Sequence, residues 1–206
     1  MTRPAVFQAT ALLLDHPAHD WSRRLREVRS AVRQLPGAEV QLLLSFCDRV
    51  ETLDPLDLAA RYVATFDRSR RRCLYLTYYT DGDTRRRGAS LARLKSLYRE
   101  HGWLPPEEEL PDFLPLMLEF AARSPAAGVP LLTEYRPALE VLRYALLAHR
   151  SPYADLLGAA CQCLPGAAPA SREEALRLAR TGPPTETVGL EPFPVQPEPS
   201  AQGARR

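Results

Sequence analysis

The sequence predicts an all-α protein, folded as a single-domain helical bundle of about eight or nine helices. Apolar residues recur three and four positions apart over most of the chain, which is the period of an amphipathic helix. Alternating β-branched runs bounded by hairpin turns are missing, so strands are not expected. With 206 residues, of which 45% are hydrophobic, the chain is long enough to bury a substantial core.

The first clear helical pattern follows Asp20, which is suited to cap a helix, and ends at Pro36-Gly37. One face of this segment carries the apolar residues Trp21, Leu25, Val28, Val32 and Leu35. The next segment keeps the period through Leu43, Phe46, Cys47 and Val50. Asp54-Pro55 then starts another helix, because the aspartate accepts a bond at the N-cap and proline at N1 loses no donor. We expect its inward face to carry Leu56, Ala59, Tyr62, Val63 and Phe66.

A tyrosine-rich helix is predicted next, because Leu74, Tyr75, Tyr78 and Tyr79 are spaced to form one aromatic-aliphatic face. Gly82 is the expected stop of this helix, and Asp83 is the expected N-cap of the following one. That second helix covers residues 85–99 and turns Leu91, Leu94 and Tyr98 inward. A tyrosine face beside a polar turn suits peptide binding, and packing into the core explains the same pattern.

The second half of the chain continues as helices after an acidic linker over residues 104–110. Asp112 is the expected N-cap of a buried central helix, which would place Pro115 at N3, where its missing N–H is not needed. A long helix follows with Tyr135, Leu139, Leu142 and Leu146 on one face and a kink near Pro137. A shorter helix follows Ser151-Pro152 and covers residues 153–163.

The chain is expected to divide into a helical domain over residues 1–180 and a tail over residues 181–206. The tail carries six prolines and little periodicity, which is typical of disordered segments. No segment approaches 18 uninterrupted apolar residues, and no cleavable leader is visible near Asp15. The four cysteines are too sparse for a disulfide framework. A cytoplasmic, reduced location without direct membrane insertion is therefore expected.

The charge of the chain is uneven, although the formal net charge is only +2. Residues 61–101 contain ten arginines and Lys95 against four acidic residues, a net charge of +7. One basic sector on a near-neutral protein suits a protein or small-anion contact better than bulk nucleic-acid binding. No helix-turn-helix accompanies this sector, so no nucleic-acid partner is expected.

The sequence offers little support for an enzyme, a resident metal or a cofactor. None of the histidines, His16, His19, His101 and His149, stands at metal-ligand spacing with a carboxylate. Cys161 and Cys163 lack the C-x-x-C spacing of zinc and redox sites. No nucleophile elbow, phosphate-binding glycine loop or dinucleotide fingerprint occurs.

Two strings carry a resemblance to a known family: YVATFDRSRRRCLYLTYYTDGDTRRRGASLARLKSLYREHGW and, shortly after it, ELPDFLPLMLEFAA. They resemble the nitrate reductase molybdenum cofactor assembly chaperones, within the all-helical redox-enzyme maturation chaperones. The similarity runs from about Leu12 to Leu164, and the string FDRSRRRCLYLTYYTDGDTRRRG favours this subfamily. Phe113 stands where many relatives have histidine, so no role of that histidine is carried over.

The resemblance implies a chaperone that binds the N-terminal segment of the catalytic subunit of membrane-bound respiratory nitrate reductase. Such proteins delay membrane docking and favour insertion of the molybdopterin guanine dinucleotide cofactor. A helix-in-groove contact would suit this task. The expected peptide-binding residues are Tyr75, Tyr78, Tyr79, Asp83, Glu109 and Asp112, and the expected contacts to the client body or an anion are Arg85, Arg86 and Arg87.

Three alternatives remain at this point. A helical adaptor, or a maturation chaperone for another molybdoenzyme, would have a similar sequence and a different client. A metal-dependent enzyme would hold a divalent ion with Asp81, Asp83 and Glu109. A nucleic-acid adaptor would use the +7 sector and bind in a strongly salt-dependent way.

Overall fold

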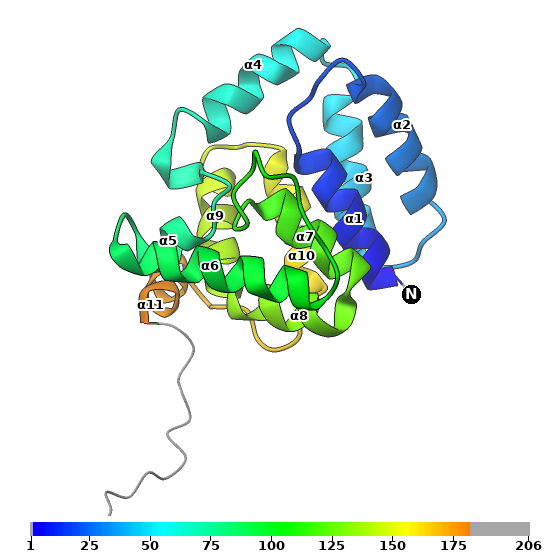
Figure 1. The fold of residues 1–206 in the computed structure, drawn as a ribbon. Coiled ribbons are helices and arrows are strands. Elements are labelled where there is room, and N and C mark those ends of the chain that lie inside the picture. The colour runs from blue at the N-terminus through cyan, green and yellow to red at the C-terminus, as the bar shows by residue number, and fades with distance from the viewer. Residues whose placement is uncertain (1, 182–206) are drawn as a thin grey trace, which may run out of the picture.

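The computed structural model describes residues 2–181, and Met1 and residues 182–206 lie outside this description. The described chain forms α-helices joined by short loops (Figure 1). The helices are α1 (Thr2–Leu14), α2 (Trp21–Val32), α3 (Ala38–Val50), α4 (Pro55–Phe66), α5 (Thr77–Asp81), α6 (Arg85–Glu100), α7 (Leu114–Arg123), α8 (Pro125–Glu134), α9 (Arg136–Ala148), α10 (Tyr153–Gln162) and α11 (Arg172–Thr181), with a 3-10 turn η1 (Arg70–Arg72) before α5.

The all-α prediction is confirmed, and residues 2–181 contain eleven α-helices where about eight or nine were expected. Part of the excess comes from the N-terminal apolar run, which forms the full helix α1. Apart from Thr181, the predicted C-terminal tail lies outside the described residues. Pro137 stands in the first turn of α9, so it interrupts no helical hydrogen bond there, and α8 ends three residues before it at Glu134.

Helix α7 lies in the centre of the core, as predicted for this apolar segment. Its residues Leu114, Met117 and Phe120 have no exposed surface, and the helix packs against α1 on one side and α8 on another. The α7–α8 contact is close enough to require glycine. A Cβ built on Gly128 would lie 2.3 Å from the Cα of Ala121, so only glycine lets the two backbones approach this closely.

The buried faces of α2 and α3 follow the predicted positions, with Trp21, Leu25, Phe46 and Cys47 among the buried residues. The predicted face of α4 is wrong at its start, because Leu56 is 81% exposed. The buried residues of α4 are Leu58, Tyr62, Thr65 and Phe66. In Figure 1, α4 extends along the rim of the molecule.

The helix-capping predictions succeed at Asp54 and Gly82 and fail at Asp83 and Asp112. The Asp54 carboxylate accepts from the N–H of Leu56 at 2.8 Å, and Gly82 ends α5 with φ of 64°. The N-cap of α6 is Thr84, and the N-cap of α7 is Phe113, which puts Pro115 in the second helical position. Asp20 precedes α2 without a side-chain capping bond.

The predicted tyrosine helix is wrong in extent. Helix α5 has only five residues, and Tyr75 lies before it in extended chain that forms an antiparallel bridge with Phe113. Two backbone bonds fix this crossing: the Leu76 N–H donates to the Asp112 carbonyl at 3.0 Å, and the Leu114 N–H donates to the Leu74 carbonyl at 2.8 Å. Long-range pairing therefore replaces the local helical period at these residues.

Candidate functional site

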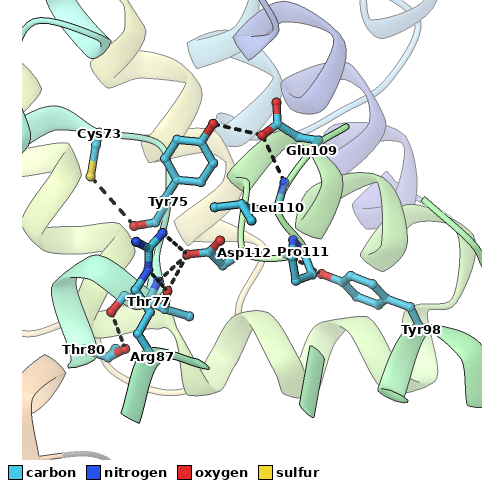
Figure 2. Close-up of polar contacts among 10 residues, drawn as sticks. All are labelled: Cys73, Tyr75, Thr77, Thr80, Arg87, Tyr98, Glu109, Leu110, Pro111 and Asp112. Carbon is cyan, nitrogen blue, oxygen red and sulfur yellow. Dashed lines mark hydrogen bonds and ion pairs between the residues drawn. The ribbon is translucent and has the colours of Figure 1, made fainter. Parts of the chain in front are cut away.

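The centre of the site is the buried carboxylate of Asp112, which has no exposed surface. Its Oδ2 accepts from the Thr77 hydroxyl at 2.5 Å and from the Thr77 N–H at 3.2 Å (Figure 2). Arg87 adds an ion pair at 3.7 Å and donates from Nε to the Thr77 hydroxyl oxygen at 3.0 Å. Asp112 thus ties α5 and α6 to the loop before α7. This role explains why its carboxylate does not cap α7.

Tyr98 supports the same loop from α6. Its hydroxyl donates to the Pro111 carbonyl at 2.7 Å (Figure 2). Its ring packs against Trp103 and Phe120. Burial raises the pKa of Tyr98, so the hydroxyl stays a neutral donor. The inward position predicted for Tyr98 is confirmed, and the loop is fixed at both Pro111 and Asp112.

Tyr75 points away from this network toward Glu109. Its hydroxyl donates to Glu109 Oε1 at 2.9 Å, and the same oxygen accepts from the Leu110 N–H at 3.1 Å. The Tyr75 ring lies 5.5 Å from the ring of Phe113, measured between centroids. Burial and the neighbouring carboxylate of Glu109 both raise the pKa of Tyr75. Tyr75 and Glu109, two predicted peptide-binding residues, therefore lie in direct contact.

Tyr79 has a mainly structural position. Its side chain is only 8% exposed, and its hydroxyl donates to the Cys73 carbonyl at 2.9 Å and to the Arg71 carbonyl at 3.3 Å. Burial raises its pKa strongly. Tyr78 is half-buried and packs edge-on against the Tyr79 ring at 6.1 Å. The three tyrosines therefore do not form the single face that the sequence predicted.

A groove lies where Tyr75 and Glu109 meet α4 and the end of α1, and we call it the acidic groove. It has a volume of about 410 Å³. Its walls are aromatic and aliphatic, and three carboxylates lie among them. The lining residues are Asp15, His16, Tyr62, Phe66, Asp67, Cys73, Leu74, Tyr75, Glu109 and Phe113.

The three carboxylates of the acidic groove differ in how they are paired. Asp15 forms an ion pair with Arg24 at 3.0 Å. Asp67 and Glu109 have no cationic partner within residues 2–181. An apolar groove with two unpaired carboxylates fits a segment that brings both apolar and basic side chains.

The other predicted site residues lie elsewhere. Tyr78 and Tyr79 line a second pocket with residues of η1, α9 and α11. Asp83, Arg85 and Arg86 are exposed at the start of α6, whereas Arg87 serves Asp112. The sequence did not single out Asp15, Asp67, Tyr62 and Phe66 as site residues, because they come from distant segments that only the folded chain brings together.

The alternative of a metal site gains no support from the part of the chain that the structure describes. Residues 2–181 hold no group of three or more His, Cys, Asp or Glu side chains placed to bind a metal ion. Asp81 and Glu109 line different pockets. Among the same residues, no helix is long and apolar enough to cross a membrane.

Comparison with known proteins gives a family assignment. Residues 31–158 match the family described as nitrate reductase delta subunit. The chain belongs to this family. The match includes α3 to α9 and therefore both the Asp112 network and most of the acidic groove.

Relatives within the family are named as assembly chaperones. The NarJ protein of Bacillus subtilis is 35% identical over 75% of this chain and 85% of its own length. The nitrate reductase molybdenum cofactor assembly chaperone NarJ of Escherichia coli is 36% identical over 70% of this chain and 63% of its own length. The resemblance noted from the sequence is thereby confirmed, and these relatives are chaperones and not enzymes.

Two further comparisons mark the limits of the family resemblance. The nitrate reductase-like protein NarX of Mycobacterium tuberculosis is 40% identical over 76% of this chain, which spans only 24% of the NarX length. A crystal structure of a proposed redox enzyme maturation protein from Archaeoglobus fulgidus has a TM-score of 0.58 and 20% identity. It covers 77% of this chain and 91% of its own, and it shows the same helical fold.

Proposed function

We propose that this protein is an assembly chaperone for a nitrate reductase. In this proposal it binds the N-terminal segment of the molybdenum-containing catalytic subunit and favours insertion of the molybdenum cofactor before membrane docking. The observation that carries the proposal is the 35% identity to NarJ of Bacillus subtilis over 85% of that protein. The matched stretch covers 75% of this chain.

The acidic groove is the proposed site for the client segment. The half-buried rings of Tyr75 and Phe113 offer aromatic surface to apolar side chains of a short helix. Asp67 and Glu109 offer charge to its basic side chains. Phe113 replaces the histidine of many relatives, so this wall of the groove is aromatic and uncharged. An exposed groove of mixed polarity also suits a chaperone, which must release its client.

The contributions of the predicted residues differ in this proposal. Tyr75 and Glu109 contact the client directly. Asp112 holds the chain on either side of the groove wall through Thr77, and Tyr79 holds the segment from Arg71 to Cys73. Tyr78, Asp83, Arg85 and Arg86 remain accessible to the folded part of the client. Arg87 acts through Asp112, because its guanidinium already pairs with that carboxylate.

The test is a calorimetric titration of the full chain with a synthetic peptide copying the N-terminus of a nitrate reductase catalytic subunit. We expect a dissociation constant in the micromolar range or tighter, about −8 kcal/mol, without added metal or nucleotide. The double variant Asp67→Asn, Glu109→Gln removes both unpaired charges of the groove and keeps the shape of the side chains. Its affinity should fall by about tenfold or more.

The matched control is Asp57→Asn, Glu108→Gln, which removes the same charge from exposed residues outside the groove. It should bind like the wild type. A peptide from the catalytic subunit of another molybdoenzyme, bound more tightly, would assign a different client. No binding of the nitrate reductase peptide by the wild type would reject the proposed function, and equal loss in both variants would move the site out of the groove.

A further inference from the structure

The second pocket, which lies beside α5, carries the opposite charge to the acidic groove. Arg70 and Arg71 come from η1, and Arg172 and Arg180 come from α11. The pocket has a volume of about 500 Å³, and Tyr78, Tyr79 and Asp81 complete its polar lining. With four arginines and one aspartate, the lining has a net charge of +3. We call it the arginine pocket.

Helix α11 supplies two of the four arginines from one stripe of its surface. Arg172, Leu176 and Arg180 are four residues apart, so they share one face of the helix. The neighbouring stripe packs through Ala175 and Ala179, both buried, and α11 contacts α9 and α5. Arg172 and Arg180 lie beside this buried stripe, and they line the pocket together with Arg70 and Arg71 of η1.

On the opposite side, Tyr79 fixes the position of η1. Its hydroxyl bonds to the carbonyls of Arg71 and Cys73, which joins the arginine turn to α5. The pocket is therefore made of side chains on a fixed backbone. Helix α11 packs against α5, and Figure 1 shows the two helices close together.

The four guanidinium groups have no partners within residues 2–181. None of them forms an ion pair or a hydrogen bond there, whereas Arg87, Arg93 and Arg143 each pair with a carboxylate. Like charges held together without counter-charges repel each other, so an anion that bridges them is favoured. Arginine binds phosphate oxygens through paired N–H donors, and the pocket offers such donors from two sides, η1 and α11.

We propose that the arginine pocket binds a diphosphate-bearing small molecule. Arg70 and Arg71 contact one side of the diphosphate, and Arg172 and Arg180 contact the other. The half-buried Tyr78 ring offers a flat surface to the rest of the ligand. Asp81 Oδ2 is buried and accepts no hydrogen bond from the described residues, so an N–H or O–H donor of the ligand would satisfy it.

The proposal concerns a small ligand and not a nucleic acid. The four exposed arginines gather around one hollow of about 500 Å³, a size typical of small-molecule sites, whereas nonspecific nucleic-acid binding uses an extended basic track along the backbone. The arginine pocket shares no lining residue with the acidic groove, so diphosphate binding is independent of the proposed client contact.

The experiment titrates the full chain with inorganic pyrophosphate, ADP and GDP in separate calorimetric runs at constant ionic strength. We expect saturable one-site binding of the diphosphates and no comparable binding of sulfate. The double variant Arg172→Gln, Arg180→Gln should lose at least tenfold in affinity. Its matched control, Arg33→Gln, Arg61→Gln, removes the same charge from exposed arginines outside the pocket and should bind like the wild type.

The three ligands separate the sources of affinity. Equal affinity for pyrophosphate and the nucleotides would show that the diphosphate alone is recognised, and tighter nucleotide binding would add a contact from Tyr78 or Asp81. Absence of diphosphate binding, equal loss in both double variants, or binding of DNA alone would overturn the proposal. The client peptide should bind the Arg172→Gln, Arg180→Gln variant like the wild type, so failure here leaves the proposed function untouched.

Discussion

The acidic groove and the arginine pocket take residues from the same segment, yet they carry opposite charge. Cys73, Leu74 and Tyr75 line the groove, and residues 78–82 line the pocket. The chain passes from the groove to the pocket at Thr77, where extended chain becomes helix α5. The Asp112 carboxylate accepts from the Thr77 N–H at this point. Residues 73–82 thus contribute to two surfaces, because the chain turns at the buried contact between Thr77 and Asp112.

Among changes that affect both the acidic groove and the arginine pocket, removal of the Asp112 side chain should have the largest effect. Asp112→Ala leaves the Thr77 N–H without its acceptor and Arg87 without its ion-pair partner in a buried setting. We expect the free energy of unfolding to fall by about 3 kcal/mol, measured by urea denaturation. Both surfaces should weaken together, because both depend on this turn of the chain.

Asp112→Asn is the informative control for that prediction. An amide oxygen can still accept from the Thr77 N–H, so this variant should lose less stability than Asp112→Ala. Equal losses would mean that the ion pair with Arg87, and not the bond to Thr77, holds the two segments together. A stable Asp112→Ala protein with both ligands bound normally would contradict the role assigned to this carboxylate.

Exchanging ligands between the two sets of variants sharpens the comparison further. Each double variant should lose about tenfold, or 1.4 kcal/mol, for its own ligand and less than twofold for the other. The groove variant is Asp67→Asn, Glu109→Gln, and the pocket variant is Arg172→Gln, Arg180→Gln. Calorimetry of both proteins with both ligands gives the four values. Loss of both ligands in either variant would mean that the two surfaces are coupled.

The hydroxyl of Tyr79 should have a smaller effect than the charges. Tyr79→Phe removes the donor to the carbonyls of Cys73 and Arg71, at an expected cost of about 1 kcal/mol. For a chain of this size the melting temperature should fall by about 2–4 °C. Tyr78→Phe is the matched control, since the Tyr78 hydroxyl makes no hydrogen bond within the described residues, and its melting temperature should stay unchanged.

The helical period predicted the fold well because most of the core is made of amphipathic helices packed along one face. Residues such as Trp21, Leu43 and Tyr98 therefore lie where their spacing placed them. The site was harder to predict, because its geometry depends on contacts between distant segments. The bridge between Tyr75 and Phe113 overrides the local helical spacing, and Asp112 turns from a cap into a buried acceptor for the same reason. Tyr75 and Glu109 were predicted as site residues, but their contact came only with the fold.

The smallest expected effect is that of Leu56 in α4, the helix that forms one wall of the groove, and Leu58 of the same helix is its buried control. The predicted inward face of α4 included Leu56 and left out Leu58, yet Leu56 is 81% exposed and Leu58 is 1% exposed. Leu56→Ala should therefore change the free energy of unfolding by less than about 0.5 kcal/mol, whereas Leu58→Ala should cost about 2–5 kcal/mol. Urea denaturation of the two variants measures both values. A large loss from Leu56→Ala would mean that this leucine is covered in solution, and the groove would then have a further wall beyond α4.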